Sequence, residues 1–165
     1  MAIENQADLE RLIEQQARKA IEGATEEILK IFKEDYIKKM VYNSHGKNVS
    51  YYNGTGKATG EFENSWNWTD IKRVVNSLVT SLFYNPDLLS HDSPTFLHGS
   101  KYSSPEDVRE NLMDILNKEG RSSSLWLSVS RPQAYFDEFI SSMFDDGELD
   151  KILTKHFLAN GFTRV

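Results

Sequence analysis

The chain has 165 residues, of which 39% are hydrophobic and 12% aromatic, and this suffices for one domain or for one domain with an extended arm. Its formal net charge of −6 argues against a general affinity for nucleic acid, because that affinity requires clustered Lys and Arg side chains that displace phosphate counterions. Because the chain has no cysteine, a disulfide framework, a thiolate nucleophile and a zinc site of the cysteine type are excluded.

The N-terminus does not have the pattern of a signal peptide. Glu4, Asp8, Glu10 and Glu14 lie where a basic region and an apolar run would be required. No apolar run approaches the roughly 18 residues that are needed to span a bilayer. We therefore expect a soluble protein that is made and used in the cytoplasm, unless it is exported within a larger assembly.

Residues 7–41 are predicted to form one long amphipathic helix, because apolar residues recur at steps of three and four and polar residues occupy the other face. The predicted stripe consists of Leu9, Ile13, Ala17, Ala20, Ala24, Ile28, Ile31 and, as its polar last member, Asp35, and it is widened by Leu12, Ile21 and Phe32. Such a helix would be roughly 50 Å long. We therefore expect part of the stripe to pack on a neighbouring copy or a partner, with an ordinary core helix that has a frayed first turn as the alternative. Gly23 is a position where this helix could bend.

A loop at 42–60 precedes two predicted strands. In 61–70, side chains alternate as in a half-buried strand, with Phe62, Asn64, Trp66 and Trp68 on one side and Glu63, Ser65 and Asn67 on the other. After a turn around Asp70–Lys72, the second strand, Arg73–Tyr84, is apolar on both faces: Leu78, Leu82 and Tyr84 suit a core, and Val75, Val79 and Phe83 are opposite. A strand of this kind is covered on both faces, so we expect another subunit to cover one of them.

The second half of the chain begins with a long polar loop at 85–104. Helices are predicted from Pro105 to Gly120, over 133–144 and over 149–160 with Gly161 as the C-cap, and a short strand is predicted at 124–131. The fold class is therefore α+β: a long N-terminal helix, a small antiparallel sheet of about 3–5 strands, and two to three further helices packed on it. We expect a single domain, 1–165, with an N-terminal helical arm over about 7–41.

No pattern of catalytic, cofactor-binding or metal-binding residues stands out, so the sequence predicts none of these sites and no cofactor. The histidines His45, His91, His98 and His156 have no metal-ligand spacing. The segment Asp145–Glu148 lacks the alternating ligands of an EF-hand, and Glu61 and Glu63 share one predicted strand face, whereas glycosidase carboxylates oppose each other across a cleft. A hydrolase or metal enzyme that uses His91, Asp92 and His98 of loop 85–104 is the weakest alternative.

The order of these elements resembles that of the neck proteins of tailed bacteriophages, the head–tail joining or tail-completion family. Two short motifs carry the resemblance: the strand opening Thr59-Gly60-Glu61-Phe62-Glu63-Asn64-Ser65-Trp66, and the segment Arg131-Pro132-Gln133-Ala134-Tyr135-Phe136 before the last helices. A polar loop that contains His98-Gly99-Ser100 follows the second predicted strand. The insertion at 85–120 and the presence of two C-terminal helices depart from a minimal member, so tail completion, tail terminator and head-closure adaptor remain open.

The resemblance implies a non-catalytic structural protein of the virion neck, assembled in the host bacterial cytoplasm. Such a protein forms a homo-oligomeric ring that joins the head and portal to the tail tube, with portal, tail-tube or tail-terminator proteins as partners. DNA would pass through the lumen without specific binding, and a surface without a basic patch suits that passage. No membrane is involved. A cytoplasmic protein-binding or regulatory α+β module is the main alternative.

Overall fold

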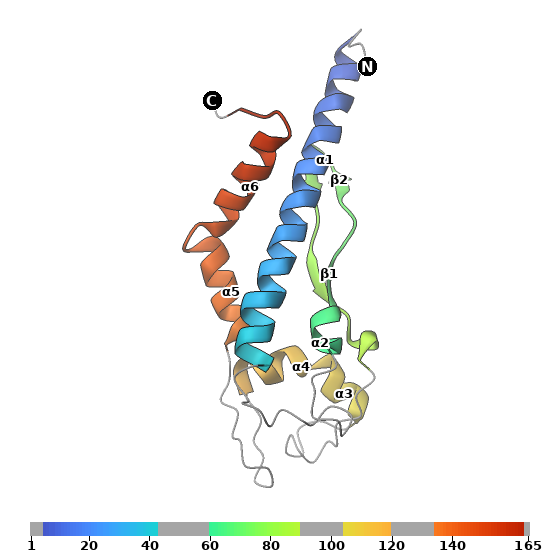
Figure 1. Cartoon of the computed structure of the whole chain (residues 1–165). Helices are drawn as coiled ribbons and strands as arrows, with labels where there is room; N and C mark the ends of the chain where they lie inside the picture. Colours follow the sequence, from blue (N-terminus) through green and yellow to red (C-terminus); the bar gives the residue numbers. More distant parts are fainter. Residues whose placement is uncertain (1–4, 43–59, 90–103, 120–133, 164–165) are drawn as a thin grey trace.

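The computed structural model describes residues 5–42, 60–89, 104–119 and 134–163. Several predictions lie outside these ranges, namely those for most of the 42–60 loop, for His45, His91 and His98, and for the strand 124–131. Within them the fold is α+β, as predicted. A long N-terminal helix runs through the molecule, a β-hairpin lies along one flank of it, and the last two helices lie along the other (Figure 1).

The long helix consists of α1 (Gln6–Ile31) and the π-helical segment η1 (Phe32–Tyr42) that continues it. The side chain of Asn5 caps its start by accepting a hydrogen bond of 3.0 Å from the amide of Asp8. The prediction of one helix over about 7–41 is therefore confirmed in extent, with a change of hydrogen-bonding pattern inside it.

The buried face of this helix follows the predicted stripe only in the middle. Ala20, Ala24 and Ile28 are buried as expected. After Ile28 the buried residues are Phe32, Ile37 and Val41, whereas Ile31 is only partly buried against the core and Asp35 is partly exposed. Because a π-helix closes its hydrogen bonds over five residues, steps of four and five replace the steps of three and four that were assumed. At the other end, Leu9 and Ile13 are exposed.

The first predicted strand begins later than expected. Residues Glu61–Asn64 form a short helix, α2, which starts after Gly60 in the left-handed conformation at φ 78°. The hydroxyl of Ser65 donates a hydrogen bond of 2.7 Å to the carbonyl of Phe62, and Ser65 is fully buried. Strand β1 is therefore only Trp66–Trp68. Phe62 and Trp66 are both buried, but one helical turn rather than strand alternation brings them to the same side.

The hairpin consists of two antiparallel strand pairs. β1 pairs with β4 (Leu82–Tyr84), and β2 (Lys72–Val74) pairs with β3 (Ser77–Val79). The chain therefore reverses at Val75 and Asn76, and the expected turn around Asp70–Lys72 was wrong. We call β1 and β2 the first arm of the hairpin and β3 and β4 the second arm. Between the two strand pairs, three residues of the first arm, 69–71, lie opposite only two residues of the second arm, 80–81. The one extra residue makes a β-bulge in the first arm.

Thr69 holds the bulge together. Its amide donates a hydrogen bond of 2.9 Å to the carbonyl of Ser81, and its hydroxyl oxygen accepts one of 2.9 Å from the amide of Ser81. Because of the extra residue, side chains in β2 point to the opposite side of the hairpin from the side that simple alternation from β1 would give. As a result Arg73, rather than Lys72 or Val74, faces α1, where its Nη1 lies 2.8 Å from Oε2 of Glu14.

The remaining helices complete the fold, and the last two of them pack directly against the long helix. Their bounds are Pro105–Glu110 for α3, Leu112–Asp114 for α4, Ile115–Glu119 for the π-helical η5, Tyr135–Phe144 for α5 and Glu148–Ala159 for α6, with the 3-10 turn η3 at Pro86–Leu88. α3 begins at Pro105 and Gly161 follows α6 at φ 88°, both as predicted, and the side chain of Ser104 caps α3. Leu158, near the end of α6, is exposed.

The core is an aromatic cluster where η1, α2, β1 and α5 meet. The ring of Phe32 lies 4.9 Å from that of Trp66 and 4.6 Å from that of Phe139, measured between centroids. Trp66 also stacks on Phe136 at 5.6 Å. Its relative exposure is 2%, which places the ring wholly inside the subunit.

Candidate functional site

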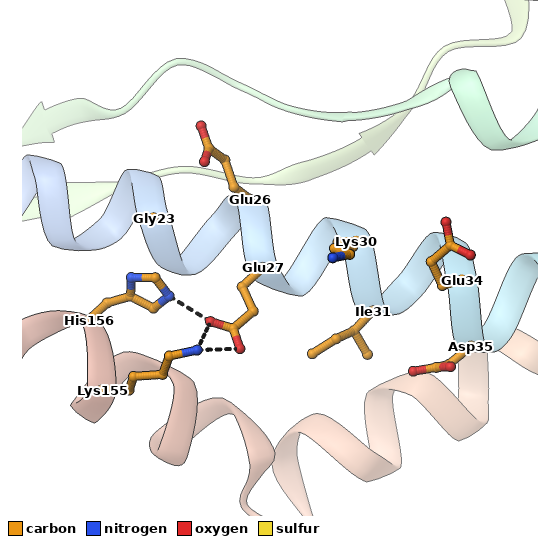
Figure 2. A pocket seen from close by; sticks show the side chains of 9 residues that line it. All are labelled: Gly23, Glu26, Glu27, Lys30, Ile31, Glu34, Asp35, Lys155 and His156. Carbon is orange, nitrogen blue, oxygen red and sulfur yellow. Dashed lines mark hydrogen bonds and ion pairs between the residues drawn. The ribbon is translucent and has the colours of Figure 1, made fainter.

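A groove lies between the long helix and the last helices (Figure 2). It has a volume of about 560 Å³, and α1, η1 and α6 line it with Gly23, Glu26, Glu27, Lys30, Ile31, Glu34, Asp35, Lys155 and His156. At one end of the groove, Glu27 points from α1 toward α6. Its carboxylate accepts a hydrogen bond of 2.7 Å from Lys155 Nζ and lies 2.7 Å from Nε2 of His156.

Gly23 makes this contact between α1 and α6 possible. A Cβ atom placed on Gly23 would lie 2.5 Å from Nδ1 and 2.9 Å from Cε1 of His156, closer than real Cβ atoms approach other groups. The absence of a side chain therefore lets the imidazole lie against the α1 backbone. Gly23 was considered as a bending point, but α1 is an unbroken α-helix over Gln6–Ile31, so its role is to permit close approach.

The charges around Glu27 stabilise its contact with Lys155 and His156. The hydrogen bonds from Lys155 and then His156 lower the pKa of the Glu27 carboxyl from its ordinary value. A carboxylate paired with a histidine also orients the general base in many hydrolases, but none of the described residues that line this groove is a Ser, Thr or Cys that could serve as a nucleophile. The cluster therefore holds α6 against α1.

The polar residues considered from the sequence lie apart from one another where the structure describes them. Glu63 lies 3.2 Å from Lys38 on η1, in an ion pair between α2 and the long helix. Asp145 accepts a hydrogen bond of 2.8 Å from Ser141, in the turn between α5 and α6. Within the described ranges, no three His, Cys, Asp or Glu side chains could hold a metal ion. His91, Asp92 and His98 lie outside those ranges.

The contact of His156 with Gly23 and Glu27 was not predicted. His156 was seen as one of four scattered histidines, and more than 120 residues separate it from α1 in the sequence. The only signal was that Glu27 and Gly23 are four residues apart and so share a helix face. That spacing does not indicate which later residue packs there.

The outer face of the hairpin is exposed and apolar. We define the hairpin face as Lys72, Val74, Val75, Val79 and Phe83. Val74 is 53% exposed and Val75, at the tip, is 83% exposed. The inner face lies toward α1, where Nε1 of Trp68 donates a hydrogen bond of 2.9 Å to the carbonyl of Thr25. The alternation predicted for Val79 and Phe83 against Leu78, Leu82 and Tyr84 is thus confirmed.

A second exposed apolar surface lies on the opposite flank, on α5 and the turn that follows it. We define the α5 corner as Asp137, Ile140, Phe144, Asp145 and Asp146. Steps of three and four residues place Asp137, Ile140 and Phe144 on one helix face, and Phe144 is 65% exposed. Ile140 also lies at the surface.

Comparison of the chain with protein-family models, with curated proteins and with solved structures finds no match. Within the part of the chain that the structure describes, no helix combines the length and the apolar character that crossing a membrane requires.

Proposed function

We propose that this chain is a non-catalytic structural subunit of the neck of a tailed bacteriophage, where a ring of copies joins the head and portal to the tail tube. The observation that carries the proposal is that two elements present apolar side chains beyond the core. The first turns of α1 expose Leu9 and Ile13, and the hairpin exposes its outer face. Exposed apolar surface of this kind is typical of subunits that bury it on assembly.

The packing of the two motifs that resemble the neck family also supports the proposal. Phe62 of the first motif lies 5.9 Å from Tyr135 of the second, and Trp66 lies 5.6 Å from Phe136, between ring centroids. The motifs therefore meet in the core, with their aromatic residues in packing roles. This arrangement favours a scaffold over an active site at these positions.

In this proposal the ring belongs to the virion, and DNA passes through its lumen without specific binding. The formal net charge of −6 supports that part, because a strongly basic lumen would hold the phosphate backbone. A ring whose lumen proves strongly basic would contradict it. Whether the subunit completes the tail, terminates it or closes the head depends on which neighbour it binds.

Reconstitution with the proposed neighbours tests the function. The portal and tail-tube proteins encoded in the same genome are purified, mixed with this chain and imaged by negative-stain electron microscopy. We expect rings at the end of the tail tube or on the portal. Binding to neither assembly, together with a gene neighbourhood that lacks portal, capsid and tail-tube genes, would reject the proposal and favour a protein-binding or regulatory module.

A further inference from the structure

The hairpin face and the α5 corner lie on opposite flanks of the molecule. Figure 1 places the hairpin on one side of α1 and α5 with α6 on the other, and Figure 2 shows α1 between the hairpin and the last helices from a second direction. Two different surfaces on opposite flanks are the arrangement that head-to-tail contacts between identical subunits require, and such contacts generate rings when the rotation closes.

The two surfaces carry opposite charges. Residues 71–84 contain Lys72 and Arg73 and no acidic residue, whereas residues 137–146 contain four acidic residues and no basic one. Arg73 is already paired with Glu14 on the inner side of the hairpin. Lys72 is on the outer side and has no ion pair with any described residue. Each surface therefore presents exposed apolar side chains beside charges of one sign.

The hairpin tip has a conformation that the isolated subunit does not explain. Val75 has φ 55°, in the left-handed region that β-branched residues rarely adopt. A two-residue hairpin turn with a positive φ at its first central position ordinarily has glycine there. Here the position holds the most exposed large apolar side chain of the described residues. Strain of this kind persists at sites where the side chain has a function.

From the opposite flanks, the opposite charges and the strained tip, we infer that the hairpin face of one copy docks on the α5 corner of the next copy. Val75 packs against Ile140 and Phe144 of the neighbour, and Lys72 faces the acidic surface to which Asp137 and Asp146 contribute. The inference rests on the proposed function in one respect, because repetition of this contact is what builds the ring. The contact itself is a property of the chain alone.

Cross-linking between single-cysteine chains tests the contact, since the chain has no cysteine of its own. One chain carries Asn76→Cys at the hairpin tip and the other carries Ser141→Cys on α5, and both positions are exposed. The two chains are mixed and treated with a short bismaleimide, which can give two cross-linked homodimers and one mixed product that contains both chains. A size tag on one chain separates these three products on a gel. We expect the mixed product to dominate. A statistical distribution of the three products, an excess of either homodimer or no product would each overturn the inference.

Further substitutions in the two single-cysteine chains distinguish specific docking from chance collision. Val75→Asp in the Asn76→Cys chain should reduce the mixed product about tenfold or more, as loss of a central apolar contact does at interfaces. Lys72→Glu should reduce it as well, and Asp137→Lys with Asp146→Lys on the other chain should restore it. Circular dichroism of each variant verifies the fold. Folded variants that cross-link as well as the parent pair would overturn the inference.

The outcome is separable from that of the proposed function, because no phage component is present in the cross-linking experiment. A dominant mixed product together with absence of rings on portal or tail tube would uphold the contact and reject the neck function. Rings with a statistical distribution of cross-linked products would uphold the neck function and reject this interface.

Discussion

His156 on α6 lies against the backbone of Gly23 on α1, so closely that a Cβ on Gly23 would be 2.5 Å from its Nδ1. In an isolated helix, Gly23→Ala would increase the stability of the helix by as much as about 1 kcal/mol, because alanine has the higher helix propensity. Here the added methyl group must displace the imidazole from its contact with Glu27. Since overpacking typically costs about 1–3 kcal/mol, we expect Gly23→Ala to lower the free energy of unfolding, measured by urea denaturation.

The matched background for this test is His156→Ala, in which the space beside Gly23 is empty. There Gly23→Ala should stabilise the protein, because only the propensity gain remains. The difference between the two backgrounds is the coupling free energy of the pair. Equal effects of Gly23→Ala in both backgrounds would contradict the close approach of α6 to α1.

The carboxylate of Glu27 should make the α1–α6 contact sensitive to acid. Its pKa is lowered in the folded protein from an ordinary value of 4.5, mainly by the hydrogen bond from Lys155 and then by that from His156. A group whose folded pKa is lowered contributes stability that is present above its unfolded pKa and lost as pH falls through the folded pKa. Glu27→Gln should therefore reduce stability at neutral pH, by less than about 1 kcal/mol because the pair is partly exposed.

The pH profile of the difference between parent and Glu27→Gln is the decisive measurement. The difference in unfolding free energy should be constant from neutral pH down to about the ordinary value and then shrink in more acidic solution. Glu26→Gln is the control, because Glu26 points away from α6 (Figure 2) and is exposed. A pH-independent difference for Glu27→Gln, or an equal one for Glu26→Gln, would refute the prediction.

The partly buried Tyr84 and the buried Tyr135 should respond differently to loss of the hydroxyl group. Tyr84 donates a hydrogen bond of 2.8 Å to the carbonyl of Arg109, so Tyr84→Phe should lower the free energy of unfolding by about 1 kcal/mol. The hydroxyl of Tyr135 is buried and has no hydrogen-bond partner among the described residues. Tyr135→Phe should be neutral or stabilising. If thermal denaturation showed that Tyr135→Phe destabilises the protein as much as Tyr84→Phe does, Tyr135 would have a hydrogen-bond partner outside the described residues.

The sequence predicted the elements whose local signals agree with their packing. These elements are the start of α3 at Pro105, the end of α6 at Gly161, and the buried residues Ala20, Ala24 and Ile28 of α1. The start of β1 was wrong because Phe62 and Trp66 are four residues apart. Both a strand and one turn of helix place residues at that spacing on one side, and only Gly60 at positive φ decides in favour of the helix.

The hairpin turn was misplaced for a related reason. Asp70–Lys72 has turn-forming composition, whereas the actual turn, Val75–Asn76, has a β-branched residue where glycine is usual. The bulge at Thr69 then moved Val74 to the outer face, and no local pattern indicates a bulge. The contact of Gly23 with His156 required the tertiary structure, because the two residues are distant in sequence.

The first turns of α1 should contribute little to the stability of the subunit. No side chain from residue 5 to residue 13 is buried, and Glu14, which holds Arg73, comes after them. Removal of residues 1–13 should therefore change the free energy of unfolding by less than about 1 kcal/mol. Under the proposed neck function, it should weaken ring formation in the reconstitution with portal or tail tube. Unfolding of the truncated chain would show that these turns belong to the core.

Substitution of Val75 by glycine should stabilise the subunit and weaken its association with other copies. Glycine adopts φ 55° without strain, so Val75→Gly should raise the free energy of unfolding by about 1 kcal/mol, even after the greater freedom of glycine in the unfolded chain. The same change removes the apolar side chain at the tip, so it should weaken contacts between copies. Thermal denaturation measures the first effect, and sedimentation at increasing protein concentration measures the second.

Asn76→Gly is the matched control for Val75→Gly, because Asn76 is the other central residue of the turn and does not have a positive φ. Glycine there relieves no strain and only increases the freedom of the unfolded chain, so it should be slightly destabilising. If Val75→Gly destabilised the subunit as well, the left-handed conformation of Val75 would not be strained. If Val75→Gly stabilised the subunit and left association unchanged, the strained residue would have no part in assembly. A gain in stability together with a loss of association is the combination expected of a residue whose conformation is maintained for a contact with another copy.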